Sequence, residues 1–101
     1  MNILKNLFGK STNLQQFIDE GAVIIDVRTP QEFDQGHVKG SKNIPLDSLQ
    51  NRFEEIRNLN KPVITVCQSG MRSGTAKSFL ESKGLTVING GAWATLNKIA
   101  S

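Results

Sequence analysis

The stretch that decides the fold is Pro62-Val-Ile-Thr-Val-Cys-Gln-Ser-Gly-Met-Arg-Ser73. Its apolar, β-branched first half predicts a buried strand that ends at Cys67, the only cysteine of the chain. A polar loop with a glycine follows, and the residues after it favour a helix whose apolar face is formed by Ala76, Phe79 and Leu80. A strand, a tight loop and a helix in this order point backbone N–H groups and the positive end of a helix dipole toward one spot. We therefore expect the loop to hold an anion.

Cys67 is the candidate nucleophile at the centre of this loop. A sulfur surrounded by such donors ionises more easily than a free thiol, whose pKa is about 8.5, and the thiolate is the reactive form. Arg72 adds a fixed positive charge that can face the sulfur or an incoming anion. The alternative is that Cys67 is a small buried hydrophobic residue. The polar run after it favours the anion loop, because such residues are poor neighbours in a core.

The segment Cys67-Gln-Ser-Gly-Met-Arg-Ser73 resembles the active-site loop of single-domain rhodaneses, which are thiosulfate sulfurtransferases. Other segments are similar to further motifs of that family and occur in the same order. These segments are Asp26-Val-Arg28 with Glu32-Phe33, Gly36-His-Val-Lys-Gly-Ser41 with Asn43-Ile-Pro45, and Gly90-Gly91 with Trp93. The resemblance runs from about residue 12 to the C-terminus, and several motifs in order are far more specific than the loop alone.

Apolar runs alternate with helical patterns along the chain. Near-continuous apolar character at residues 22–27 and 86–88 is typical of strands buried in a parallel sheet, whereas residues 10–12 are only a weak candidate for a first strand. Helices are expected after Thr12, from Thr29 to Gly36, after Asp47, from Ser73 to Lys83 and around Trp93. The alternation predicts a three-layer α/β domain with a parallel sheet of four or five strands flanked by helices. The resemblance implies that this domain is rhodanese-like.

Capping patterns mark the starts of three of these helices. Thr29-Pro-Gln-Glu32 combines a Thr N-cap, a proline at the first helical position and a glutamate at the third. Thr12 has Gln15 at the capping-box spacing, and Asp47 can cap the next helix with Gln50 three residues on. After residues 86–88, the run Asn89-Gly-Gly91 predicts a turn.

Asp26 lies near the carboxyl end of its predicted strand, where open α/β sheets place their ligand sites. We expect Asp26 and Arg28 to be supporting residues that lie beside the Cys67 loop and brace it by hydrogen bonds or charge. The alternative is that Asp26 only satisfies loop amides while Arg28 pairs with Glu32, four residues on. His37 is expected to be a hydrogen-bonded structural residue rather than a general base.

Length and composition argue against nucleic-acid binding, a membrane span and a structural metal site. The chain has 101 residues and a net charge of +3 from scattered lysines and arginines, which argues against a nucleic-acid partner. No stretch approaches the roughly 18 apolar residues that span a membrane. One cysteine and one histidine argue against a structural metal site. A free reactive thiol fits a reducing compartment, so we expect the cytoplasm.

Two segments are distinguished along the chain. Residues 1–10 form a short N-terminal segment with apolar side chains at 3, 4, 7 and 8, which predicts about two turns of amphipathic helix. We expect this segment to pack on its own domain, with a membrane surface or a partner protein as the alternative. The resemblance implies that residues 11–101 form the rhodanese-like domain.

The resemblance implies a sulfurtransferase that uses Cys67 in covalent catalysis. The Cys67 thiolate would take sulfur from a small anionic donor such as thiosulfate, and the persulfide would pass it to cyanide in an assay or to a thiol in the cell. The substrate-binding loop would consist of Gln68, Ser69, Gly70, Met71, Arg72 and Ser73. Loop amides would stabilise the persulfide anion and Arg72 would orient the donor. No metal or organic cofactor is needed, and a protein persulfide could act as donor or acceptor.

Two other functions use the same residues. Cysteine phosphatases and arsenate reductases also place a cysteine in an anion loop, but cysteine phosphatases generally have one residue more between Cys and Arg, and many have His where this chain has Val66. A carrier or interaction module would receive a persulfide from a partner without turnover, with Met71 and the N-terminal segment as a docking surface. The physiological donor and acceptor, the pathway and the oligomeric state are left open by the sequence.

Overall fold

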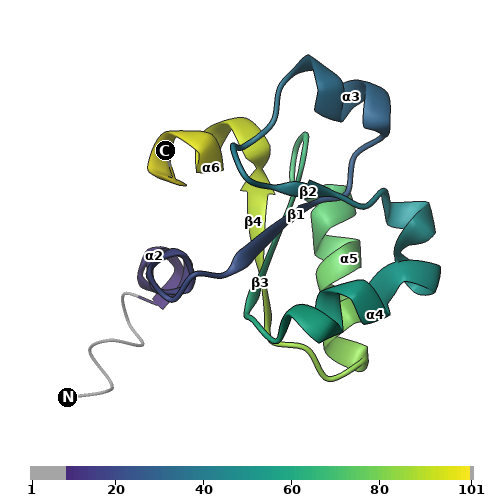
Figure 1. Ribbon diagram of the computed structural model, residues 1–101. Coiled ribbons are helices and arrows are strands. Elements are labelled where there is room, and N and C mark those ends of the chain that lie inside the picture. The colour runs from purple at the N-terminus through teal and green to yellow at the C-terminus, as the bar shows by residue number, and fades with distance from the viewer. Residues whose placement is uncertain (1–8, 101) are drawn as a thin grey trace.

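The computed structural model describes residues 9–100, with side chains from residue 13 onward (Figure 1). In chain order its elements are α2 (Gly9–Asp19), β1 (Val23–Asp26), α3 (Pro30–Gln35), β2 (Lys42–Asn43), the 3₁₀ turn η1 (Leu46–Ser48), α4 (Leu49–Leu59), β3 (Val63–Cys67), α5 (Met71–Ser82), β4 (Val87–Ala92) and α6 (Trp93–Ala100). The four strands are parallel and lie in the order β2-β1-β3-β4. The predicted α/β fold with a parallel sheet is therefore confirmed.

The strand β3 lies in the middle of the fold because its side chains are buried on both faces of the sheet. On one face, Val63 and Cys67 join a core with residues of α4 and α5. On the other face, Ile64 and Val66 join a core with residues of α2 and α6. Figure 1 shows the resulting three layers, with α4 and α5 to the right of the sheet and α2 and α6 to the left.

The carboxyl ends of the strands bring the polar residues of the fold to one edge of the sheet. Asp26 ends β1 opposite Val66, and Cys67 ends β3 opposite Ala92 of β4. Because all strands are parallel, these ends lie at the same edge, which is where open α/β sheets place their sites. The fold thus gathers the loops after β1 and β3, together with the end of β4, around Cys67.

The strand β4 continues through the glycine pair where the sequence predicts a turn, so that prediction is wrong. Thr65 lies opposite Asn89 and Val66 opposite Gly91, which leaves Gly90 as an extra residue in a β-bulge. A Cβ on Gly90 would lie 2.6 Å from Cγ2 of Ile64, so only glycine fits here. Pairing with β3 overrides the local turn preference, and the bulge redirects the side chains next to it.

Helix starts agree with the sequence only in part. The capping box of α3 is confirmed, because the Glu32 N–H donates to Oγ1 of Thr29 at 3.2 Å and the Thr29 N–H donates to Oε1 of Glu32 at 3.0 Å. Asp47 does not cap α4. It lies instead in η1, whose Ser48 N–H donates to the Pro45 carbonyl at 2.9 Å, and Ser48 occupies the N-cap position of α4.

The helix α2 begins at Gly9, so Thr12 lies inside the helix rather than at its N-cap, and residues 10–12 are helical rather than a strand. The amphipathic helix expected over residues 1–10 lies outside the described residues, apart from the last two, which begin α2. Among the helices that the structure describes, none is long and apolar enough to span a membrane.

Candidate active site

The sulfur of Cys67 accepts hydrogen bonds from the loop that follows β3. The Gly70 N–H donates to Sγ at 3.0 Å and the Ser73 N–H donates to it at 3.3 Å. Ser73 lies in the first turn of α5, where the N–H groups have no partner within the helix. Gly70 turns the chain with a φ of 103°, which favours glycine. The loop therefore directs amide hydrogens at the buried sulfur, as the sequence predicts for an anion loop.

Hydrogen bonding lowers the pKa of Cys67 below its ordinary value. Burial of the sulfur acts in the opposite direction and raises the pKa. The Ser73 side chain and the amides of Ser73, Gly70 and Ser69 together outweigh that effect. The site therefore favours the thiolate, which is the reactive form of cysteine.

Ser73 links the sulfur to a residue of β4 that sequence reasoning missed. The Cys67 thiol donates to Oγ of Ser73 at 3.4 Å, and the Ser73 hydroxyl donates to Oδ1 of Asn89 at 2.6 Å. Asn89 also accepts from the Gly91 N–H at 2.9 Å and donates from Nδ2 to the Gly70 carbonyl at 3.1 Å. Its position directly after the apolar run at residues 86–88 is the signal that could have identified it.

Arg72 forms a two-point ion pair with Glu32 of α3. Nη1 donates to Oε1 at 2.8 Å and Nη2 donates to Oε2 at 3.0 Å. The Arg72 hydrogen bonds and those from Thr29 lower the pKa of Glu32 to about 2, and Glu32 in turn raises the pKa of Arg72. The charge of Cys67 also raises the pKa of Arg72, so the two groups interact. The guanidinium is therefore held by Glu32 and does not donate a hydrogen bond to the sulfur.

Asp26 and Arg28 form a buried ion pair with 2.7 Å between Oδ2 and Nη2. The remaining hydrogen bonds of the Arg28 guanidinium go to the carbonyls of Gly36 and Glu32, at 2.8 and 3.3 Å, and its Cζ lies 4.8 Å from the centre of the Trp93 ring. The alternative in which Arg28 pairs with the Glu32 carboxylate is therefore wrong.

Within the described chain the pair makes no hydrogen bond to residues 67–73, so bracing by direct hydrogen bonds is not observed. The charge of Asp26 does act on the loop, because it contributes to the raised pKa of Arg72. Arg28 holds both ends of α3 through the Glu32 and Gly36 carbonyls. Since α3 carries Glu32, which binds Arg72, the support reaches the loop through α3.

The other predicted residues lie at the surface of the loop or outside it. Gln68 and Ser69 are exposed, and Met71 is 80% exposed at the start of α5. His37 stacks on Phe33 and its Nδ1 lies 2.7 Å from the carbonyl of that residue, so Nδ1 is the donor. Within the described part of the chain, no three His, Cys, Asp or Glu side chains form a group that could hold a metal ion.

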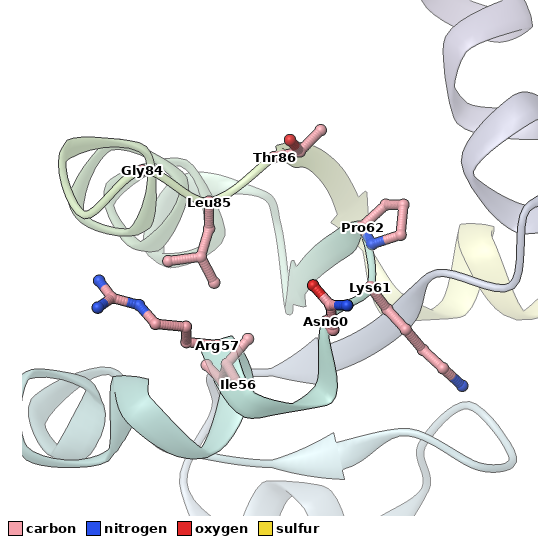
Figure 2. A pocket seen from close by; sticks show the side chains of 8 residues that line it. All are labelled: Ile56, Arg57, Asn60, Lys61, Pro62, Gly84, Leu85 and Thr86. Carbon is pink, nitrogen blue, oxygen red and sulfur yellow. The ribbon is translucent and has the colours of Figure 1, made fainter.

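A cavity of about 460 Å³ lies away from Cys67, at the amino ends of β3 and β4 (Figure 2). It is lined by Ile56, Arg57, Asn60, Lys61, Pro62, Gly84, Leu85 and Thr86. Its lining has neither a nucleophilic thiol nor a carboxylate or imidazole, and Arg57 already donates to the Lys83 carbonyl at 2.9 Å. The candidate nucleophile Cys67 lies at the opposite end of the sheet.

Comparisons with known proteins agree with this geometry. The family model of the rhodanese-like domain matches residues 11–95. The chain is 49% identical over 67 residues to the uncharacterized protein YqhL of Bacillus subtilis, covering 66% of this chain and 52% of YqhL. It is 41% identical over 65 residues to the thiosulfate sulfurtransferase PspE of Escherichia coli, covering 63% of this chain and 62% of PspE. A solved rhodanese with anions from E. coli superposes with a TM-score of 0.67 at 36% identity, covering 73% of this chain and 89% of that one.

The chain belongs to the family of rhodanese-like domains, as the resemblance of its motifs predicts. The matched part of the chain spans about half the length of YqhL. Relatives in the family include proteins named as thiosulfate sulfurtransferases, and PspE is one of them.

Proposed function

We propose that the protein is a sulfurtransferase that carries sulfane sulfur as a persulfide on Cys67. The observation that supports this most is the sulfur at the end of β3 with the Gly70 and Ser73 amides 3.0 and 3.3 Å away. Such a cradle stabilises an anionic sulfur without a bound cofactor. The lowered pKa of Cys67 supplies the thiolate that the reaction needs. Because the mechanism needs a reduced thiol, we propose a reducing compartment such as the cytoplasm.

In the first step, the Cys67 thiolate attacks the outer sulfur of thiosulfate. A new S–S bond forms to Cys67, the S–S bond of thiosulfate breaks, and sulfite leaves with the electron pair. In the second step, a thiol or cyanide attacks the outer sulfur of the persulfide. The product is a new persulfide or thiocyanate, and Cys67 leaves as a thiolate, which restores the starting state.

The loop residues have separate roles in this proposal. The amides of Ser69, Gly70 and Ser73 bind the anionic sulfur on Cys67. Arg72 uses two of its N–H groups on Glu32, and its remaining donors bind the sulfonate end of an anionic donor. Met71, which is 80% exposed, forms the rim of the loop that an acceptor meets first. Asp26 and Arg28 support the loop through α3.

A second candidate is a carrier that receives its sulfur from a protein persulfide and passes it to a partner without turnover of thiosulfate. The exposed Met71 beside the loop favours it, because an uncovered apolar side chain next to a reactive centre suits contact with another protein. Poor thiosulfate turnover together with rapid transfer from a protein persulfide supports the carrier. Hydrolysis of an aryl phosphate that is lost in Cys67→Ser supports a phosphatase instead of either function.

The test is a turnover assay with thiosulfate and cyanide for the wild type, Cys67→Ser and Arg72→Gln. We expect Cys67→Ser to abolish thiocyanate formation, because serine does not form the persulfide. We expect Arg72→Gln to raise KM for thiosulfate more than it lowers kcat, because it removes a charge that binds the donor. Full turnover in Cys67→Ser rules out the proposed mechanism. Arg57→Gln, which alters the distant cavity, is the matched control.

A further inference from the structure

The Ser73 hydroxyl lies between two acceptors and has one proton to donate. On one side is Sγ of Cys67 at 3.4 Å, and on the other is Oδ1 of Asn89 at 2.6 Å. Ser73 is buried, so water does not take the place of either partner. The direction of this single proton therefore decides whether the sulfur faces the hydroxyl proton or the lone pair of Ser73 Oγ.

The backbone fixes the orientation of the Asn89 amide. The Gly91 N–H can only donate, so the Asn89 side-chain atom that lies 2.9 Å from it must be the carbonyl oxygen Oδ1. The Gly70 carbonyl can only accept, so the atom at 3.1 Å from it must be Nδ2. The atom that faces Ser73 is thus an acceptor, and the hydroxyl proton lies on the Asn89 side. The lone pair of Oγ faces the sulfur.

The amides around Cys67 favour the thiolate, but this one contact is arranged for the neutral thiol. The Ser73 hydroxyl lowers the pKa of Cys67 only when it turns its proton toward the sulfur. The S–H group of Cys67 donates into the lone pair of Ser73 Oγ. An anionic sulfur has no proton to donate, so it gains a hydrogen bond from Ser73 only when the hydroxyl turns away from Asn89. A hydrogen bond to an ionised group is about twice as strong as a neutral one, but here it is formed at the expense of the bond to Asn89.

We propose that Asn89 is a positioning residue that holds the Ser73 hydroxyl proton away from the Cys67 sulfur and so opposes its ionisation. The bulge at Gly90 is the structural reason, because it places the Asn89 side chain over the loop while Asn89 stays paired with Thr65. The inference rests on the proposed role of Cys67 as the nucleophile. It concerns the ionisation of the sulfur and not the identity of the donor.

The charges around the sulfur are the same with and without Asn89. Arg72 of α5 is paired with Glu32 of α3, and Asp26 of β1 is paired with Arg28. Further along α5, Lys77 is paired with Glu81. Of the side chains that the structure describes on the other helices in contact with β3, the charged ones are Asp19 on α2 and Lys98 on α6, and β4 has no ionisable side chain. A neutral substitution at Asn89 therefore changes the hydrogen bonds of the sulfur and leaves its charged neighbours in place.

The test is a titration of the thiolate by its ultraviolet absorbance in the wild type, Asn89→Ala, Ser73→Ala and the double variant. The chain has one cysteine and no tyrosine, so the signal comes from Cys67 alone. We expect Asn89→Ala to lower the midpoint by roughly half to one pH unit, because the freed hydroxyl donates to the thiolate. We expect no such fall when Asn89→Ala is added to Ser73→Ala. Asn58→Ala, an exposed residue of α4, is the matched control.

If Asn89 only holds the loop in place, Asn89→Ala should raise the midpoint of the titration instead of lowering it. A loosened loop would lose amide hydrogen bonds to the sulfur, which stabilise the thiolate. An unchanged or raised midpoint in Asn89→Ala overturns the proposal, and so does a fall that persists without the Ser73 hydroxyl. Should Asn89→Ala not fold, Asn89→Asp takes its place. Its carboxylate should hold the Ser73 proton more firmly and raise the midpoint, and a rise of equal size in the Ser73→Ala background contradicts the proposal. No sulfur donor is used, so failure of sulfur transfer and failure of this inference are separate results.

Discussion

Glu32 and Arg72 are joined by two hydrogen bonds of 2.8 and 3.0 Å, although 40 residues separate them in the chain. The same Glu32 carboxylate accepts the Thr29 N–H at 3.0 Å and so completes the capping box of α3. One side chain therefore stabilises the start of α3 and orients the only guanidinium of the cysteine loop. The loops after β1 and β3 are linked through this pair.

Replacing Glu32 with Gln should lower the pKa of Cys67. The amide keeps the shape of the side chain but no longer balances the Arg72 charge, and an unbalanced cation near the sulfur favours the thiolate. We expect a fall of a few tenths of a pH unit in the thiolate titration at low salt, and a smaller one at high salt. Glu54→Gln, in an exposed pair on α4, should leave the midpoint unchanged. A rise in Glu32→Gln contradicts this electrostatic role.

The same pair should make stability depend on acid pH. The pKa of Glu32 is lowered from 4.5 to about 2 in the folded protein, first by Arg72 and then by Thr29. A lowered folded-state pKa contributes stability above pH 4.5 that is lost as the pH falls toward 2. The free energy of unfolding of the wild type should therefore exceed that of Glu32→Gln at neutral pH, and the difference should shrink across this range. Urea unfolding of both proteins at several pH values measures this difference in free energy. A difference that does not change with pH argues against a lowered pKa of Glu32.

Removing one member of the buried pair should destabilise the fold strongly. Arg28→Met leaves the Asp26 carboxylate without its partner in the core, which typically costs about 3–5 kcal/mol. Arg52→Met, in an exposed pair with Glu55, should cost less than about 1 kcal/mol. Denaturant unfolding compares the two variants. Equal losses of unfolding free energy in the two variants would show that burial does not decide how much each ion pair contributes to stability.

The bulge in β4 should tolerate only glycine at position 90. In Gly90→Ala, the new Cβ would lie 2.6 Å from Cγ2 of Ile64 and 3.0 Å from Cγ1 of Val66. Such crowding in a packed core typically costs about 1–3 kcal/mol. Ser78→Ala, an exposed change on α5, is the control for thermal unfolding. A variant as stable as the wild type contradicts the close packing of the bulge.

Local patterns were enough to predict the order of the elements and the centre of the site. The apolar run before Cys67 predicts β3, and the capping residues Thr29 and Glu32 predict the start of α3, because these signals act within a few residues. The polar loop after Cys67 likewise predicts amides around the sulfur, and two of them donate to it.

Contacts between distant segments were not predictable in the same way. The Glu32 carboxylate pairs with Arg72 rather than with Arg28, because the fold brings α3 over the cysteine loop and the Arg28 guanidinium pairs with Asp26. Asn89 was interpreted as a turn residue, since nothing in its local sequence shows that pairing with β3 extends through the bulge. The Glu32–Arg72 contact and the position of Asn89 both depend on strand pairing and packing. The spacing of residues in one sequence does not show either of these.

The proposed function requires that Cys67 carries transferable sulfur. Intact-protein mass spectrometry after treatment with thiosulfate, before and after addition of cyanide, tests it most directly in the wild type and Cys67→Ser. We expect a gain of one sulfur atom in the wild type, its loss with cyanide, and no gain in Cys67→Ser. Absence of the gain in a folded wild-type protein contradicts thiosulfate as donor, and a gain that persists in Cys67→Ser contradicts the role of the cysteine itself.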